Sequence, residues 1–95
     1  MLALLREAGA PEEWHADMLA IAWCESGWRV GAIGDGGNSL GLYQMWTGWA
    51  PAAGYGVDEL LDPAVNTRVA VYVRSVRGRW GGGGGWTCAD LLSLP

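Results

Sequence analysis

The stretch WCESGWRVGAIGDGGNSLGLYQMW, residues 23–46, decides the fold, because a helix must end near its start and glycines interrupt regular structure through its middle. Four residues that lead into it share one face of a predicted helix: Trp14, Met18, Ile21 and Glu25. Three of the four are apolar, so the stripe predicted to face the core ends in the carboxylate of Glu25, just before Ser26-Gly27 stops the helix. Such a carboxylate needs a partner or a function, because burying an unpaired charge costs free energy.

The middle of this stretch is rich in glycine. Residues 31–41 read GAIGDGGNSLG, which predicts turns or a short irregular hairpin and excludes a helix or a long strand. A short semi-extended segment is expected over residues 42–46, followed by one helical turn within residues 47–53. We expect residues 31–45 to form the floor of a cleft.

Helices are predicted on both sides of the glycine-rich segment. Residues 2–8 indicate a short helix, and Pro11 opens the next one. Asp62 followed by Pro63 is typical of an N-cap with proline at the first helical position, and predicts a helix that runs to about Arg77.

The last of these helices is rich in valine. The alternation of valines at positions 69, 71 and 73 also permits a strand. A helix is favoured because the segment is longer than most strands and because four residues repeat at helical spacing: Val65, Val69, Tyr72 and Val76.

Five consecutive glycines, residues 81–85, predict a flexible loop. The tail at residues 86–92 is apolar enough to dock back on the domain, so the glycines are not expected to link two domains. The whole pattern predicts one compact, mainly α domain over residues 1–95, with a short irregular β or turn segment at the cleft.

Composition excludes several classes of function. Six arginines and no lysines stand against ten carboxylates, so the chain lacks the basic stripe that follows a phosphate backbone, and nucleic-acid binding is not expected. No apolar run approaches the ~20 residues that cross a bilayer. Residues 1–10 are too short and too soon interrupted by charge for a secretory signal, so any export signal is expected outside this chain. Seven tryptophans can fill the core, and the same flat side chains pack against sugars.

Glu25 has the sequence surroundings of a catalytic acid. Cleavage at a glycosidic oxygen needs a carboxylic acid that is still protonated near neutral pH, and burial among apolar groups raises a carboxyl pKa. Trp23 and Trp28 lie close to it in sequence, and the negative end of the helix dipole also disfavours the ionised form. The alternative is an ordinary surface ion pair between Glu25 and Arg29, one helical turn later.

Several segments, in order, resemble the core of goose-type lysozymes and lytic transglycosylases. These segments are the helix end Glu25-Ser26-Gly27, the glycine turn at 34–39 and the run Gly41-Leu42-Tyr43-Gln44-Met45. A fourth segment, Asp62-Pro63-Ala64-Val65-Asn66, is similar to the family's Asp-Pro-x-x-Asn helix start. The resemblance covers roughly residues 14–80 and implies a lysozyme-like fold. It implies that Glu25 protonates the oxygen leaving the β-1,4 bond between N-acetylmuramic acid and N-acetylglucosamine. It also implies a substrate-binding set: Ser26, Gly41, Leu42, Tyr43, Gln44 and Met45.

Asp35 matches a carboxylate that goose-type lysozymes carry in the same glycine turn, ten residues after the glutamate. It could orient or deprotonate a water on the far side of the sugar, as an inverting hydrolysis requires, or it could be a turn residue beside Gly36. Goose-type lysozymes have a second aspartate where this chain has Trp46 and Thr47. Lytic transglycosylases use a single glutamate and form a 1,6-anhydro sugar, so that outcome stays open, although the presence of Asp35 favours hydrolysis.

Cys24 and Cys88 allow two interpretations. A bridge would close a loop of more than sixty residues, worth roughly 4 kcal/mol in the chain-entropy model, whereas two buried free thiols would suit a reducing compartment. The segments Trp23-Cys24-Glu25-Ser26-Gly27 and Gly85-Trp86-Thr87-Cys88 resemble actinobacterial resuscitation-promoting factors, in which the matching cysteines pair. That resemblance implies a Cys24–Cys88 disulfide and an extracytoplasmic or phage-lysis setting.

We therefore expect a peptidoglycan-degrading muramidase that acts as a monomer on bacterial cell walls, without a cofactor. A lytic transglycosylase and a catalytically silent wall-binding domain of a phage or secreted assembly are the alternatives. His15 has no second histidine or cysteine at ligand spacing, so it is expected to be structural and no metal site is predicted. Ser26 has no histidine base nearby in sequence, so nucleophilic serine chemistry is not expected.

Overall fold

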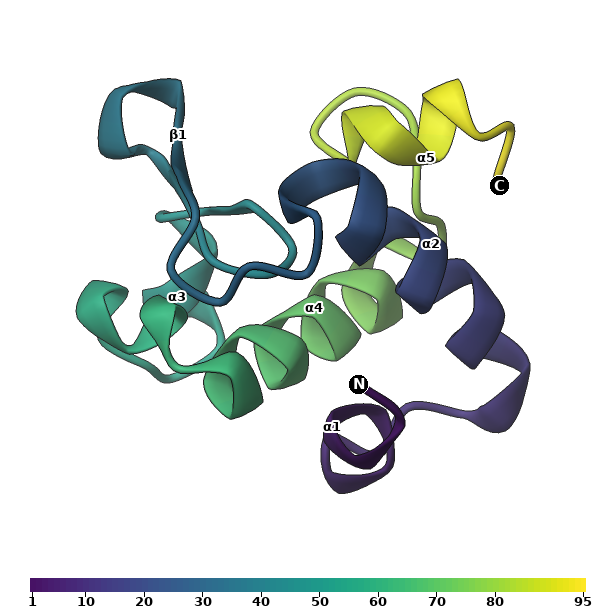
Figure 1. Cartoon of the computed structure of the whole chain (residues 1–95), viewed down its shortest axis with the longest axis horizontal. Helices are drawn as coiled ribbons and strands as arrows, with labels where there is room; N and C mark the ends of the chain where they lie inside the picture. Colours follow the sequence, from purple (N-terminus) through teal and green to yellow (C-terminus); the bar gives the residue numbers. More distant parts are fainter.

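The computed structural model describes all residues from 1 to 95 and confirms a mainly α lysozyme-like fold (Figure 1). The helices are α1 (Leu2–Glu7), α2 (His15–Ser26), α3 (Trp49–Ala52), α4 (Pro63–Arg77) and α5 (Thr87–Leu91). Short 3-10 turns are η1 (Glu12–Trp14), η2 (Asp35–Gly37) and η3 (Val57–Leu61). Three two-residue strands form an antiparallel sheet in chain order: β1 (Ile33–Gly34), β2 (Ser39–Leu40) and β3 (Met45–Trp46). None of the helices has the length and apolar character needed to cross a membrane.

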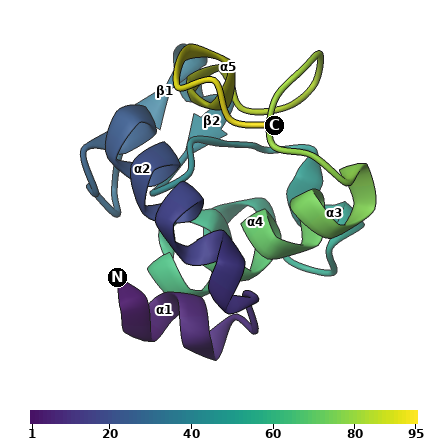
Figure 2. The same cartoon turned by 90° about the vertical axis from the view of Figure 1, so that its right-hand side faces the viewer.

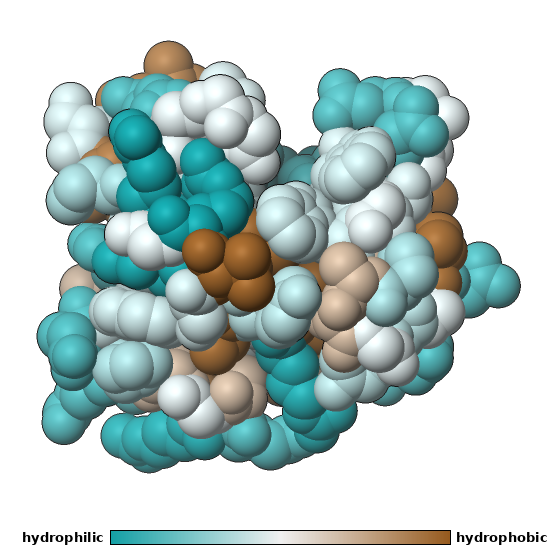
Figure 3. Space-filling model, turned by 180° about the vertical axis from the view of Figure 1, so that it is seen from behind, coloured by the Kyte–Doolittle hydropathy of each residue, from teal (hydrophilic) through white to brown (hydrophobic).

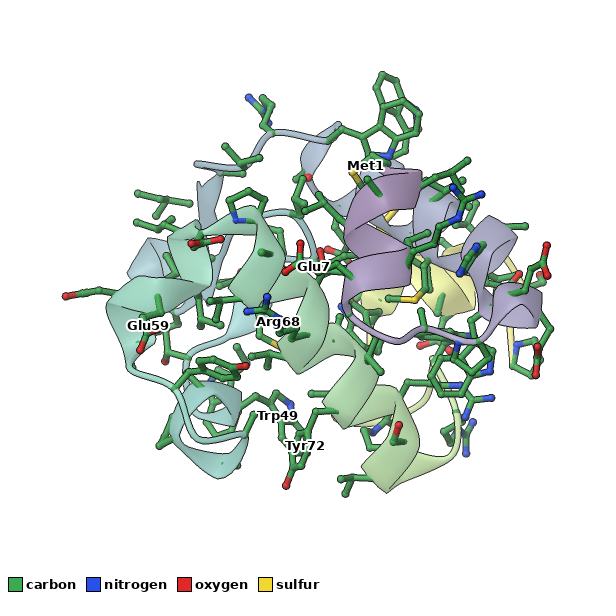
Figure 4. All side chains as sticks on the ribbon, turned by 90° about the horizontal axis from the view of Figure 1, so that it is seen from below. Met1, Glu7, Trp49, Glu59, Arg68 and Tyr72 are labelled. Atoms are coloured by element: carbon green, nitrogen blue, oxygen red, sulfur yellow. A yellow bond between two sulfur atoms is a disulfide. The ribbon has the colours of Figure 1, made fainter.

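Helix α4 lies at the centre of the molecule, with α1 on one side and α2 and α5 on the other (Figures 1 and 2). Its start is fixed as the sequence predicts, because Asp62 Oδ1 accepts hydrogen bonds from the backbone N–H groups of Ala64 at 2.8 Å and Val65 at 3.4 Å. An ion pair between Arg68 of α4 and Glu7 of α1 joins these two helices at the surface (Figure 4).

The helix predicted over residues 63–77 is present, but its buried face differs from the predicted one. Tyr72 and Val76 are 37% and 59% exposed, so the stripe that begins with Val65 and Val69 does not continue through them. The core instead takes neighbouring positions of α4, which is contacted by α1, η3, α3 and β3. The buried residues of α4 are Val65, Asn66, Thr67, Val69, Ala70 and Val73.

Helix α2 carries Glu25 in its last turn. It begins at His15 after the 3-10 turn η1, so the helix predicted from Pro11 starts as a tighter turn. It ends abruptly, because Gly27 and Trp28 both have a positive φ, of 63° and 61°. The indole N–H of Trp28 folds back to donate to the backbone oxygen of Leu19 at 3.1 Å, which fixes this end of the helix.

The segment after β2 is a turn, so the semi-extended structure predicted for residues 42–46 is wrong except at β3. Gly41 has φ +78°, and a Cβ there would lie 2.4 Å from Asn66 Nδ2 and 2.5 Å from the backbone oxygen of Leu60. The buried Asn66 side chain accepts from Tyr43 N at 3.0 Å and donates at 2.8 Å to the backbone oxygens of Leu40 and Leu60. Asn66 therefore clamps the turn against α4.

The five-glycine segment is held in place by side chains, although its composition predicts flexibility. Arg77 donates to the backbone oxygens of residues 79, 80, 81 and 83, at distances between 2.8 and 3.3 Å. Asp90 Oδ1 accepts from Gly82 N at 3.0 Å on the other side of the loop. The tail docks back on the domain as expected, with Trp86 and Ala89 buried in the core.

Candidate active site

A cavity of about 490 Å³ lies where the end of α2, the β1–β2 hairpin and the start of α5 meet. Seen from behind, the upper edge of the molecule is notched between the lobe that carries the hairpin and the lobe that carries α5 (Figure 3). The polar wall of the cavity is formed by Glu25, Asp35, Ser39, Gln44 and Thr87. Its apolar wall includes Trp46, Trp49 and Trp86. Carboxylates and aromatic rings in one concave site are typical of carbohydrate-cleaving chemistry.

Glu25 is half-buried at the edge of this cavity, and its Oε2 accepts a hydrogen bond from the backbone N–H of Cys88 at 3.2 Å. Burial raises the pKa of the Glu25 carboxyl, and the negative charge of Asp35 raises it further. The Cys88 hydrogen bond favours the ionised form, but the pKa remains above its ordinary value. Glu25 is therefore a carboxylic acid biased towards keeping its proton.

The Cys88 amide reaches Glu25 because the chain is cross-linked beside it. Cys24 and Cys88 form a disulfide with their Cα atoms 5.9 Å apart, as the resemblance to resuscitation-promoting factors implies. Cys24 precedes Glu25 in α2, and Cys88 lies in the first turn of α5. The bridge thus ties the end of α2 to the tail that carries the N–H donor.

Asp35 is held at the tip of the β1–β2 hairpin. Gly34 pairs with Ser39 across the hairpin, and the hydroxyl of Ser39 donates to Asp35 Oδ2 at 2.5 Å. Asp35 has φ +51°, a left-handed conformation that aspartate and asparagine tolerate better than most residues. The structure thus brings Asp35 into the same cavity as Glu25, with its carboxylate oriented by Ser39.

Gln44 lines the cavity, but its amide group mainly stabilises the turn beneath it. Its Nε2 donates to the backbone oxygens of Ala32 at 3.1 Å and Gly41 at 3.0 Å. A Cβ at Gly34 would lie 2.3 Å from Gln44 Oε1, so the glycine allows the amide to pack against β1. Met45 is buried and also lines the cavity, so two residues of the predicted substrate-binding set reach it.

The other four residues of that set, Ser26, Gly41, Leu42 and Tyr43, are buried behind the cavity wall and do not line it. Ser26 Oγ donates to the backbone oxygen of Ala22 at 3.1 Å, within α2. Tyr43 is fully buried, which raises the pKa of its hydroxyl. Since none of the four lines the cavity, their role in substrate binding stays a prediction.

The ion pair considered as an alternative role for Glu25 is absent. Arg29 Nε donates to the backbone oxygen of Ser26 at 2.8 Å, and the molecule's one ion pair joins Arg68 to Glu7. Gly27 and Trp28 both have a left-handed backbone conformation that ends the helix, so helical i,i+4 spacing does not continue to Arg29.

Residues that could ligate a metal are scattered over the molecule. No three or more histidine, cysteine, aspartate or glutamate side chains are grouped to hold a metal ion. The ring of His15 is within hydrogen-bonding distance, 3.0 Å, of the backbone oxygen of Ala10, where it stabilises the start of α2.

Sequence reasoning missed part of the cavity wall. It assigned no role to Ser39, although its place opposite Asp35 in a short hairpin could have suggested a hydrogen bond. The sequence predicts a loop and a tail for residues 84–87, and their position at the cavity depends on long-range contacts that no local pattern contains. The sequence does not distinguish core tryptophans from cleft tryptophans, and the structure places Trp46 and Trp49 at the cavity.

A family model described as a transglycosylase SLT domain matches residues 4–87 of the chain. Comparison of the chain with curated proteins and with solved structures found no match. The matched span contains Glu25, Asp35 and Gln44 and extends to Thr87 at the cavity wall. The chain therefore belongs to the transglycosylase SLT domain family of the lysozyme-like superfamily, whose domains act on the peptidoglycan of the cell wall.

Proposed function

We propose that this protein is a muramidase that hydrolyses the β-1,4 bond between N-acetylmuramic acid and N-acetylglucosamine in bacterial peptidoglycan. The observation that carries the proposal is the pair of carboxylates in one cavity, of which Glu25 has a raised pKa and Asp35 is exposed and oriented by Ser39. Two carboxylates in different environments divide the roles of acid and base in glycoside hydrolysis.

In the first step Glu25 acts as general acid. The Cys88 N–H engages Oε2, which leaves Oε1 to carry the transferable proton towards the cavity. That proton passes to the glycosidic oxygen as the bond from this oxygen to C1 of N-acetylmuramic acid breaks, and positive charge develops on the sugar ring. Burial of Glu25 favours the protonated form that this step consumes.

In the second step Asp35 acts as general base on a water molecule. The water attacks C1 from the face opposite the leaving oxygen while Asp35 accepts its proton, so that the product is a reducing-end sugar with inverted configuration. The hydrogen bond from Ser39 fixes Asp35 Oδ2 and leaves Oδ1 to meet the water.

Lytic transglycosylation is the second candidate, and the family to which the chain belongs favours it. In that reaction the C6 hydroxyl of N-acetylmuramic acid takes the place of water, and deprotonated Glu25 receives its proton. The product then carries a 1,6-anhydro ring. This route needs only Glu25, whereas a hydrolase uses Asp35 as well.

Mass spectrometry of the muropeptides released from purified cell walls tests the proposal. Hydrolysis leaves reducing ends, which borohydride reduces, and transglycosylation leaves anhydro ends, which are lighter by one water and resist reduction. We expect reducing ends from the wild-type protein. Predominantly anhydro ends would replace the muramidase by the transglycosylase, and no released muropeptides would leave the chain a silent wall-binding domain.

The proposed reaction places the protein at the bacterial cell wall, outside the cytoplasm or as part of a phage. We propose that residues 1–95 act as a monomeric catalytic unit. Contacts between α1 and α4 and between α2 and α5 connect both ends of the chain to the helices that build the cavity.

A further inference from the structure

The three tryptophans at the cavity differ in their exposure and in the contacts that their rings make with other protein groups. Trp86 is 6% exposed, packs edge-on against Tyr43 with ring centroids 6.3 Å apart, and donates its indole N–H to the backbone oxygen of Tyr43 at 2.9 Å. Trp49 is half-buried and packs edge-on against Tyr72 of α4, with centroids 6.4 Å apart (Figure 4). Protein contacts therefore account for both of these rings.

Trp46 is different, because it is 60% exposed while lining the cavity. It has no aromatic partner, and its indole N–H donates to no protein acceptor, in contrast to that of Trp86. The structure gives this large side chain no role in the core. Exposed aromatic rings at the rim of a concave polar site are typical of ligand contact.

The backbone beneath Trp46 supports its ring. A Cβ at Gly48 would lie 2.2, 2.3 and 2.7 Å from Cη2, Cζ3 and Cζ2, three carbons of the six-membered part of the indole. The ring therefore rests against the bare backbone of Gly48. Residues 45–46 also pair with β2 as strand β3, so the position of Trp46 is fixed by the sheet.

We propose that Trp46 is a sugar-stacking residue, whose exposed surface binds the apolar face of an N-acetylhexosamine ring in the glycan strand that occupies the cavity. The free indole N–H is available to a sugar hydroxyl or acetamido oxygen, and the indole matches the C–H face of a pyranose in size and polarity. This inference rests on the proposed function, because it concerns how the same cavity holds its glycan.

The place of Trp46 in the sequence indicates which kinetic constant its contact with the sugar affects. In the goose-type lysozymes that the sequence resembles, a second aspartate lies just past the Gln-hydrophobic pair, and in this chain Trp46-Thr47 follows Gln44-Met45. An aromatic contact there holds the sugar in the ground state and the transition state alike, so it lowers KM more than it raises kcat.

Binding is tested without turnover in the Glu25→Gln protein, by calorimetric titration with a tetrasaccharide of alternating N-acetylglucosamine and N-acetylmuramic acid. We expect Trp46→Ala in that background to raise Kd about tenfold, as loss of one buried indole face implies, and Trp46→Phe to raise it less. Trp23→Ala is the matched control, because Trp23 is 61% exposed but lies outside the cavity, and it should leave Kd unchanged.

A second pair of variants leaves the tryptophan in place. Gly48 has φ −64°, which alanine adopts freely, so Gly48→Ala should fold and displace only the ring of Trp46. We expect it to raise Kd severalfold, whereas Gly31→Ala, whose Cβ would meet nothing within 4 Å, should not. In the active protein, Trp46→Ala should raise KM and leave kcat within about twofold of the wild type.

The outcomes separate the stacking role from the proposed function. Equal affinity of the parent and Trp46→Ala proteins, or equal losses in Trp46→Ala and Trp23→Ala, would overturn the stacking role while leaving the muramidase proposal standing. If the Glu25→Gln parent binds no tetrasaccharide while the wild type still cleaves walls, the stacking role fails. If the wild type cleaves no walls, the proposed function fails as well.

Discussion

The surroundings of Glu25 shift the pKa of its carboxyl in two opposite directions. Burial and the charge of Asp35 raise its pKa, and the Cys88 N–H lowers it while fixing one carboxyl oxygen. The role of general acid that we propose for Glu25 needs this balance, because a carboxyl that is too strongly ionised holds no proton and an unanchored one does not meet the glycosidic oxygen. The chain obtains it by ending α2 immediately after Glu25 and placing the start of α5 beside it.

The raised pKa of Glu25 predicts a pH-dependent stability difference. Since its folded pKa lies above the unfolded value, the stability that the protonated form contributes is complete below the unfolded value and is lost as pH rises through the folded value. Glu25→Gln cannot ionise, so its Tm relative to the wild type should increase from about pH 4 to about pH 8. Thermal melts at both pH values check this, and a difference that does not change with pH would contradict it.

Asp35→Asn should reduce wall cleavage by roughly 100-fold without loss of the fold, since asparagine tolerates the same φ and can still accept from Ser39. Removing the negative charge should also lower the pKa of Glu25 and move the alkaline limb of the pH–rate profile to lower pH. Asp58→Asn, in the exposed turn η3, is the control. Unchanged turnover together with an unmoved alkaline limb would show that Asp35 only shapes its turn.

At the scale of elements, the loop of residues 80–86 determines the cavity wall opposite the hairpin. The loop is closed by a hydrogen bond from Trp86 N to the backbone oxygen of Trp80 at 3.0 Å, and Arg77 fills its inside. A Cβ at Gly85 would lie 2.3 Å from Arg77 Nη1, so this glycine leaves room for the guanidinium. Gly84 and Gly85 then line the cavity.

Arg77→Met should release this loop. The variant loses hydrogen bonds to four backbone oxygens of a partly exposed loop. At a net contribution of about 0.5 kcal/mol for each bond, the loss is about 2 kcal/mol, and we expect a Tm decrease of about 10 °C. Wall cleavage should fall about tenfold because the cavity wall loosens. The control is Arg6→Met, which removes an exposed arginine of α1. Equal Tm values for the two variants would show that Arg77 does not hold the loop.

The helices could be predicted from the sequence better than the segments between them. The caps at Gly27 and Asp62 are local, so the end of α2 and the start of α4 follow from a few neighbouring residues. The turn at Gly41 could not be predicted, because its conformation depends on the Asn66 side chain, which is distant in sequence. The order in the glycine loop likewise comes from Arg77 and Asp90, which composition alone does not reveal. Glu25 and Asp35 could be named because their motifs are local, whereas the other half of the cavity could not.

At the scale of the whole molecule, the Cys24–Cys88 disulfide joins the two halves of the site. It links residues that are 64 positions apart and lies directly beside the hydrogen bond between Cys88 and Glu25. In so small a domain, a link that closes this long a loop contributes roughly 4 kcal/mol in the chain-entropy model.

Reduction of this disulfide should lower Tm by about 15 °C or more and reduce wall cleavage, because the Cys88 N–H is no longer held at Glu25. The double variant Cys24→Ser, Cys88→Ser should behave like the reduced wild type, and reductant should leave its Tm unchanged. Thiol titration of the unfolded, unreduced protein provides the independent count. Two free thiols per chain would show that the bridge does not form in solution.

The most direct test of Glu25 as the catalytic acid is the rate of wall cleavage by Glu25→Gln, measured as loss of turbidity of purified cell walls. The substitution removes the transferable proton and keeps the size of the side chain, so we expect less than about 1% of wild-type activity with the fold intact by circular dichroism. Glu13→Gln, at an exposed glutamate of η1, should retain full activity. Wild-type cleavage by the Glu25→Gln protein would contradict the assignment of Glu25 as the catalytic acid.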